Sequence, residues 1–453
     1  PSLDWSEHDP GHRRSLPGYS FDANPHPVSG GATTAPATTP VREEPRPIHT
    51  NRLDAFRDAF RQVLGHAEVS ADDNFFALGG DSLKATSLTA QLKALVGVEA
   101  TVADVFAAPT PAALEARLRK AISVTRMAKA PEAADYPLSP AQERMYLASR
   151  LDPDSVTYNM ASVTLLNGLL DHDRLRSALT KLVQRHEPLR TIFMTRDSEI
   201  RQGLTRIDQS DLPLSFTHGQ VTPESVEEHL ARFVRPFSLE TGPLFRMEVV
   251  ENEDTSLLLF DLHHIIGDAT SAEILARDFG QLYDAELPPL THQYTDYIHH
   301  IRVTQQNEEL AKAENALLSQ LTDPPTADVL PLDRPRAERA SGASRVAWTL
   351  GPERTAKLTE IADARQATLP MVMLAAWGAV LSRYNGTEDL VIGTPVSGRT
   401  LAETREMIGM FVNMLPIRLK PRSNTSFNDY LTDTRTTMLD ALSAQDVPFD
   451  RIV

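Results

Sequence analysis

The segment LHHIIGDATS (262–271) places two imidazoles and a carboxylate close together, as His263, His264 and Asp268. Imidazole side chains are common acids and bases near neutral pH. Alternation along a strand that ends here puts His264 on one face, and Asp261 with His263 on the other. The spacing fits such chemistry, and it fits two structural histidines with a helix-capping Asp268 equally well. A metal site is disfavoured, because no further cluster of ligands completes it.

A second candidate residue is Ser82, in the segment DNFFALGGDSL (73–83). Two glycines leave an uncluttered backbone beside a serine that is predicted to begin a helix. A helix N-terminus offers free N–H groups and a partial positive charge, so a phosphodiester on Ser82 would be well placed. The local pattern alone favours the simpler alternative, an N-capping turn.

Composition excludes several classes of protein. The chain has 453 residues, enough for two or three domains. It has no cysteine, so disulfides, thiolate catalysis and sulfur-ligated metals are excluded. Lys+Arg 45 against Asp+Glu 61 gives a net charge of −16, which argues against nucleic-acid binding. No run of eighteen apolar residues predicts a membrane span. The absence of an initiator Met and of a leader suggests a piece of a longer cytoplasmic enzyme.

Helical periodicity predicts a small bundle of four helices between residues 50 and 122. Apolar spacing marks a helix in NRLDAFRDAFRQVLG, and Ser82 begins the next. VADVF is a short helical turn, and Thr110 caps a final helix that has Pro111 at its first position. Pro-, Gly- and Thr-rich composition predicts a flexible linker at 28–49, and a shorter linker follows at 123–135.

The rest of the chain mixes strands and helices. FRMEVVENEDTSLLLFDLHH predicts two strands joined by a polar turn. TLPMVMLAAWGAVLSRYNG predicts a long buried helix that stops at Asn385-Gly386. Thr270, with Glu273 three residues later, predicts a capping box for the helix after the histidines.

The DNFFALGGDSL segment, with the helical region around it, resembles the acyl or peptidyl carrier domains of polyketide and nonribosomal peptide synthetases. The resemblance implies that Ser82 carries a covalent 4′-phosphopantetheine, attached by a phosphopantetheinyl transferase. Ser82 would then be a tether for a thioester and not a nucleophile. Asp81 is within the variation of that family.

The part from residue 136 onward resembles the condensation domains of nonribosomal peptide synthetases. It carries a series of segments in the order typical of that family, namely LSPAQERMY (138–146), YNM (158–160), RHEPLRTIF (185–193), LHHIIGDATS (262–271), YTDYI (294–298), VIGTPVSGRT (391–400), IGMFVNMLPIRL (408–419) and QDVPF (445–449). The implied fold class is multidomain: a small all-α four-helix carrier bundle, then an α+β domain of the two-lobed chloramphenicol acetyltransferase type. The lobes are expected at 136–300 and 301–453, the second one incomplete.

The resemblance also implies roles for individual residues. His264 would lie beside the reacting amine, as a base or as a hydrogen-bond partner. His263 and Asp268 would be structural, and Asp268 would pair with Arg399 across the lobes. His186, Arg190 and Asn413 would be scaffold. The glycine of the family's HHxxxDG motif is Ala269 here, which costs stability or narrows the channel if that position needs positive φ or space.

Residues 1–27 resemble the segment that follows acyltransferase domains in modular polyketide synthases. The chain would then come from a polyketide–nonribosomal peptide hybrid, with a ketosynthase–acyltransferase module upstream. The expected reaction is amide formation with an aminoacyl thioester on a downstream carrier, which an adenylation domain supplies. No metal, nucleic acid or membrane partner is expected. The alternatives are epimerisation, which the AQERMY and FVNM segments disfavour, and a noncatalytic docking domain.

Overall fold

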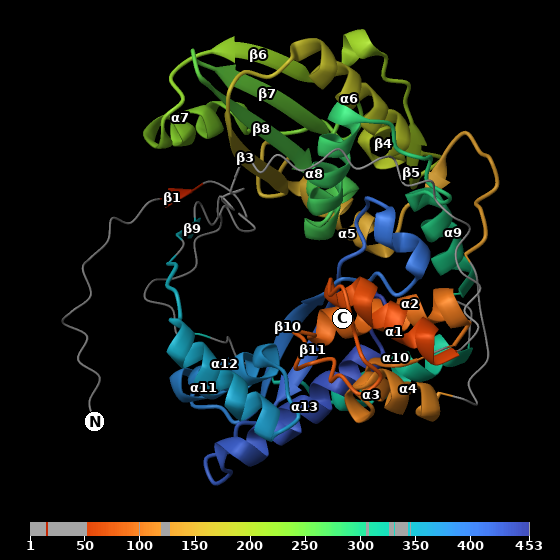
Figure 1. Cartoon of the computed structure of the whole chain (residues 1–453), viewed down its shortest axis with the longest axis vertical. Helices are drawn as coiled ribbons and strands as arrows, with labels where there is room; N and C mark the ends of the chain where they lie inside the picture. The colour runs from red at the N-terminus through yellow and green to blue at the C-terminus, as the bar shows by residue number, and fades with distance from the viewer. Residues whose placement is uncertain are drawn as a thin grey trace.

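The structure is a computed structural model. It describes residues 15–16, 52–98, 100–118, 127–304, 308–325, 330, 343–344 and 346–452. Figure 1 shows an upper, N-terminal lobe, a lower, C-terminal lobe, and a helical bundle beside the lower lobe. The predicted tail at 1–27 and the predicted linker at 28–49 lie outside the described residues, except for strand β1 (Ser15–Leu16), which pairs with β9 (Ala343–Ser344).

The bundle contains the four expected helices, which are α1 (Arg52–Leu64), α2 (Ser82–Val96), α3 (Val102–Ala107) and α4 (Pro111–Arg117). Helix α2 begins where predicted, because the side chain of Asp81 accepts a hydrogen bond from the backbone of Lys84 at 2.8 Å. Thr110 caps α4 in the same way. The sequence therefore determines these helix starts through local capping.

The glycine pair before α2 has a packing reason. Gly79 has φ +83°, which favours glycine, and a Cβ on Gly80 would lie 2.4 Å from the ring of Phe75. That ring is fully buried and meets Phe60 edge to face at 5.4 Å. The loop can therefore pass over the aromatic core only if residue 80 has no side chain.

The N-terminal lobe is built on two sheets. The larger has the order β3-β8-β7-β6 and the smaller the order β2-β5-β4. Its strands are β2 (Tyr136–Pro137), β3 (Asn159–Asn167), β4 (Thr191–Arg196), β5 (Glu199–Leu204), β6 (Leu214–His218), β7 (Phe245–Glu251) and β8 (Thr255–His263). Its helices are α5 (Pro140–Leu151), α6 (His172–Arg185), η1 (Glu187–Arg190), η2 (Gln209–Asp211), α7 (Pro223–Phe233), η3 (His264–Ile266), α8 (Ala269–Asp284) and α9 (Tyr294–Thr304). The predicted hairpin is confirmed, because β7 and β8 pair antiparallel.

The C-terminal lobe contains an antiparallel pair, β10 (Leu390–Val396) and β11 (Asn413–Leu419). Its helices are α10 (Glu308–Gln320), α11 (Pro352–Ala364), α12 (Leu369–Asn385), η4 (Ala402–Glu406), α13 (Phe427–Ser443) and η5 (Phe449–Arg451). None of the helices among the described residues is long and apolar enough to cross a membrane.

Helix α12 ends as predicted, with Gly386 in the left-handed conformation at its C-cap. The prediction that it is buried is only half right. Gly378 lies against Leu419 and Tyr430, whereas the opposite face exposes Met373, Trp377, Val380 and Tyr384. Because both faces are apolar, the sequence gives no sign of which side is packed.

The predicted linker at 123–135 is fixed over much of its length. Met127 is buried in the core of the N-terminal lobe, and its carbonyl oxygen lies 3.0 Å from His292 Nε2. The backbone of Ala130 donates to Asp296 at 2.7 Å. Residues 127–135 therefore belong to the N-terminal lobe, which corrects the expectation of a linker here.

Candidate active site

The two histidines lie where strand β8 ends. Alternation predicted that His264 would continue the strand, but β8 stops at His263 and His264 begins the short helix η3. The backbone N–H of His264 donates to the carbonyl of Tyr158 at 2.8 Å, so the YNM segment lies directly beside it. His264 is half-buried, whereas His263 is buried.

His263 holds the loop together. Its Nδ1 accepts a hydrogen bond from the backbone of Ile265 at 3.1 Å, and its ring lies near the rings of Tyr158 and Phe237. Burial, with a smaller contribution from His264, lowers the pKa of His263 to about 3. A neutral ring with an acceptor at Nδ1 fits a structural role.

Asp268 connects the histidine loop to the C-terminal lobe. Its carboxylate is buried and accepts hydrogen bonds from the backbone and hydroxyl of Ser271, at 2.8 and 2.7 Å. Arg399 Nη2 lies 2.9 Å from the same oxygen, and the backbone of Phe411 donates to the other at 3.2 Å. The sequence resemblance implied this Asp–Arg contact, but nothing in the sequence singled out Ser271.

Arg399 is held from several sides. Its Nη1 donates to the carbonyls of Thr404 and Met407, at 2.5 and 2.8 Å, and its guanidinium lies 4.0 Å from the ring of Phe411. The preceding Gly398 has φ +62°, and a Cβ there would lie 2.0 Å from the carbonyl oxygen of Phe411. The SGRT segment therefore needs its glycine for Arg399 to reach Asp268.

The residue that replaces the motif glycine causes no backbone strain. Ala269 is the first residue of α8, is exposed, and is absent from the residues with positive φ in the described chain. The helix is capped by Asp268, so the predicted capping box at Thr270 and Glu273 is wrong. Asp268, and not Thr270, is the N-cap, because Arg399 holds its carboxylate directly before the first residue of the helix.

A buried polar cluster lies beneath the histidines and was missed in the sequence. Asp261 accepts a hydrogen bond from Asn159 Nδ2 at 2.7 Å and lies 3.6 Å from Arg246. Burial raises the pKa of Asp261 to about 6 and lowers that of Arg246 to about 10. Arg246 also lies 3.7 Å from the ring of Phe237, which touches His263. The only sequence signal was a carboxylate on the buried face of an apolar strand.

The three residues predicted to be scaffold make contacts within the two lobes. His186 Nε2 lies 3.0 Å from Asp278, and both are buried. The carbonyl of Arg190 accepts from Thr205. Asn413 Nδ2 donates to the carbonyls of Gln445 and Val447, so it fixes the QDVPF segment.

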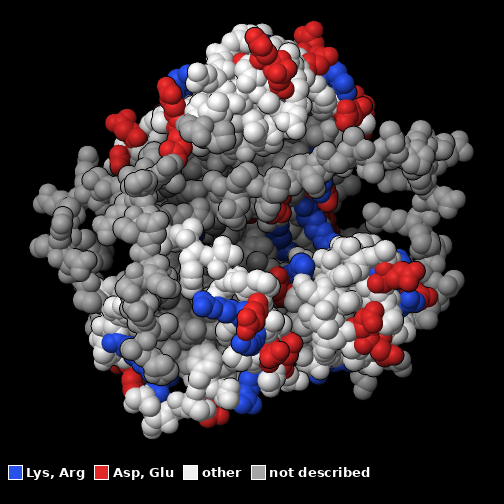
Figure 2. All heavy atoms as spheres, turned by 60° about the vertical axis from the view of Figure 1, so that its left-hand side comes forward, with Lys and Arg blue, Asp and Glu red and all other residues white. Residues whose placement is uncertain are grey.

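Several motif segments meet around a cavity of about 460 Å³. It is lined on the side of the two lobes by Ser139, Tyr297, Thr400, Asn413 and Asp446, and on the side of the bundle by Thr89 and Lys93. Figure 2 shows a hollow between the upper and lower parts of the molecule, with Lys and Arg side chains at its border.

Ser82 lies apart from these residues, as the first residue of α2 in the bundle. The structure thus brings His263, His264, Asp268 and Arg399 together and leaves Ser82 on a separate domain. The loop before it suits an attached group, because residue 80 presents only backbone and Asp81 already caps the helix.

Comparison with known proteins identifies both parts. The condensation domain family matches residues 132–453, and the phosphopantetheine attachment site family matches residues 54–118. The chain belongs to the condensation domain family. It is a carrier–condensation didomain of the nonribosomal peptide synthetase type, and the carrier domain takes a covalent 4′-phosphopantetheine. We therefore call the bundle the carrier and the two lobes the condensation domain.

Tyrocidine synthase 3 of Brevibacillus parabrevis is 37% identical over 410 residues, which are 89% of this chain but only 6% of that protein. The X-domain solved in complex with OxyB from teicoplanin biosynthesis has a TM-score of 0.64 and 26% identity, over 73% of this chain and 75% of that one. The first condensation domain of the calcium-dependent antibiotic synthetase, at 24% identity, shares the fold with a TM-score of 0.60, over 70% and 77% of the two chains. The predicted two-lobed α+β fold is thereby confirmed.

Removing Arg399 should destabilise the condensation domain strongly. Arg399→Ala leaves the buried Asp268 carboxylate without its positive partner and removes the arginine hydrogen bonds to two carbonyls, which costs about 3–5 kcal/mol of unfolding free energy. Lys357→Ala is the control, since it breaks only the exposed ion pair with Glu353 and should cost less than about 1 kcal/mol. Chemical denaturation measures both, and an equal loss in the two variants would contradict the central role of the buried pair.

The stability difference between wild type and Asp261→Asn should depend on pH. The folded protein holds the pKa of Asp261 at about 6, above the ordinary 3.8, so the folded state loses stability as pH rises from about 4 to 6. Asn cannot ionise, so the free energy of unfolding of the variant should rise relative to that of wild type by roughly 1 kcal/mol per pH unit across that window. Urea unfolding at pH 4, 5 and 6 measures this, and a constant difference would show that Asp261 does not titrate there.

Proposed function

We propose that the chain forms an amide bond between an acyl or peptidyl thioester on its own carrier and the amine of an aminoacyl thioester. The amine nitrogen bonds to the thioester carbon, the carbon–sulfur bond breaks, and the proton lost by nitrogen ends on the released sulfur. The observation that supports this proposal is that the YNM segment lies beside His264, while Arg399 of SGRT and Phe411 of the FVNM segment both contact Asp268 in the loop that follows the histidines.

His264 is the residue proposed to act at the reacting groups. Its backbone donates a hydrogen bond to Tyr158, and the loop after it is fixed by His263 and Asp268, so the backbone that carries the ring has a defined place next to the end of β8. A ring held in this way can take the proton from the amine or stabilise the developing charge by a hydrogen bond. When both reactants are held in one site, the reaction no longer depends on a chance encounter in solution, and its rate depends on how well the reacting atoms are positioned.

Ser82 is proposed as the attachment residue on the carrier. When bound, 4′-phosphopantetheine supplies the thiol that makes the acyl group a thioester. The protein's contribution is the loop of Gly79 and Gly80 and the N-cap at Asp81, which make residue 82 the first residue of α2. A phosphopantetheinyl transferase is the required partner for loading.

The wider setting is part of the same proposal. A downstream carrier, loaded by an adenylation domain, would supply the aminoacyl thioester. The segment at 1–27 supports an upstream ketosynthase–acyltransferase module and a hybrid polyketide–peptide assembly line in the cytoplasm.

Loading should be specific to Ser82. Incubation with coenzyme A and a phosphopantetheinyl transferase should add one phosphopantetheine, which peptide mapping by mass spectrometry places on Ser82. Ser82→Ala should add none, and Ser87→Ala, a nearby serine of the same helix, should load like wild type. Loading of Ser82→Ala would overturn the attachment site.

Substitution of His264 tests catalysis. With a loaded donor and a soluble aminoacyl thioester, His264→Ala should lower the rate of amide formation by about 10²-fold or more. His263→Ala should instead lose stability, because it removes a buried acceptor for the backbone of Ile265. Amide formation at the wild-type rate in His264→Ala would contradict the proposed catalytic role of His264.

A noncatalytic docking function is the second candidate. The similar X-domain is known in complex with OxyB, so this fold can serve as a binding platform in that protein. A wild-type chain that loads Ser82 but forms no amide with any aminoacyl thioester would favour this reading. Binding of a second protein that is equal in wild type and His264→Ala would support it further.

A further inference from the structure

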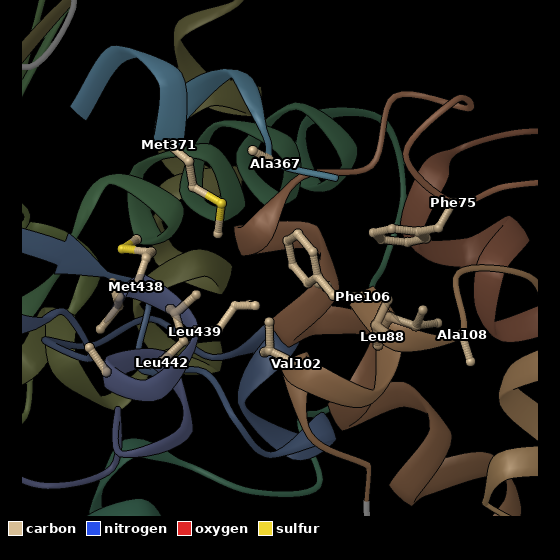
Figure 3. Packing of buried hydrophobic residues seen from close by; sticks show 14 of the residues in the cluster. Phe75, Leu88, Val102, Phe106, Ala108, Ala367, Met371, Met438, Leu439 and Leu442 are labelled. Atoms are coloured by element: carbon tan, nitrogen blue, oxygen red, sulfur yellow. The ribbon is translucent and has the colours of Figure 1, made fainter. Parts of the chain in front are cut away.

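The carrier is seated on the C-terminal lobe by an apolar contact. Val102 of α3 is buried and lies in one cluster with Leu439 and Leu442 of α13, as Figure 3 shows. The guanidinium of Arg435, also on α13, lies 5.8 Å from the ring of Phe106. The core of the carrier and the core of the lobe are thus continuous at this place.

One strong polar contact accompanies the apolar one. Arg405 of η4 donates from Nη2 to the carbonyl oxygen of Ser87, in the middle of α2, at 2.6 Å. Burial lowers the pKa of Arg405, as expected for a guanidinium taken out of water. A half-buried charged donor needs an acceptor, so Arg405 favours an arrangement in which α2 lies against η4.

The acceptor is a backbone group, and this decides what Arg405 can recognise. A main-chain carbonyl is present whatever the side chain at position 87. The contact with Arg405 therefore depends on where α2 lies and not on the side chain at that position. The apolar contact of Val102 is the part that depends on side-chain identity. The position of the carrier and the identity of its side chains therefore affect different contacts, the first that of Arg405 and the second that of Val102.

The element that carries Arg405 is itself built around the active-site arginine. The carbonyls of Thr404 and Met407, on either side of Arg405, accept hydrogen bonds from Arg399. Arg399 also holds Asp268, four residues after His264. The carrier contact and the histidine loop are thus joined through a single side chain.

We propose that Arg405 is a positioning residue that seats the chain's own carrier on the C-terminal lobe through the Ser87 carbonyl. It thereby sets where residue 82, five residues earlier in the same helix, stands relative to the condensation domain. The inference rests on the proposed function only in taking this carrier as the donor. The seating itself can be measured without any reaction.

The experiment is hydrogen–deuterium exchange on the full chain loaded with phosphopantetheine. Arg405→Met keeps the length of the side chain and removes the donor. It should raise exchange in peptides from α3 and α13, while peptides from α8 stay as in wild type. Arg405→Lys restores a donor and should recover much of the protection. Arg354→Met, on the exposed surface of α11, is the matched control and should change nothing.

Either of two results with Arg405→Met would overturn the proposal. Exchange in Arg405→Met that equals wild type would show that the contact does not hold the carrier. Increased exchange in α8 together with α13 would show that Arg405 maintains the fold of the lobes instead. Val102→Thr, which changes only the carrier side, should raise exchange in α13 by itself, and its failure to do so would count against the same seating.

A rate measurement adds a readout that a purely structural role would not give. Loss of one charged hydrogen bond should lower amide formation from the carrier-bound donor by about tenfold. The rate from a soluble N-acetylcysteamine thioester of the same acyl group should stay unchanged, and an equal fall with both donors would contradict the proposal. If neither donor reacts in wild type, the proposed function fails, while the exchange result still decides the seating.

Discussion

The buried contact between Asp268 and Arg399 is the constraint on which the rest of the site depends. Removing two charges from water is costly unless further hydrogen bonds to the pair offset the loss of hydration. Here the carboxylate collects donors from Ser271 and Phe411, and the guanidinium collects the carbonyls around η4. The pair therefore does more than join two side chains. It fixes the start of α8, the end of the histidine loop and the turn after β10 in one mutual arrangement.

Much of this arrangement could be predicted where the cause is local. The start of α2 follows from Asp81, and the end of α12 follows from Gly386, because each depends on a residue next to the helix end. The β7–β8 hairpin is marked by its polar turn. The prediction of the cap of α8 was wrong because the cause is not local: Asp268 is fixed by Arg399, a residue 131 positions away.

The missed parts of the site are those whose partners are distant or have no side-chain signature. Asp261 needs Asn159 from another strand, and Arg246 meets it only through the register of β7 against β8. Arg405 contacts a backbone carbonyl, which no sequence pattern encodes. The stretch 127–135 has the composition of a linker, and only its contacts with α9 and the strand β5 show otherwise.

The anchoring of Met127 limits how far the carrier can travel. The last described residue of the bundle is Leu118, so nine peptide units separate the carrier from its anchor on the N-terminal lobe. A fully extended chain of that length spans about 30 Å. The carrier is therefore covalently connected to the N-terminal lobe while it packs on the C-terminal lobe. Wherever the carrier moves, its Leu118 stays within about 30 Å of Met127, so the N-terminal lobe limits the positions that the carrier can take on the C-terminal lobe.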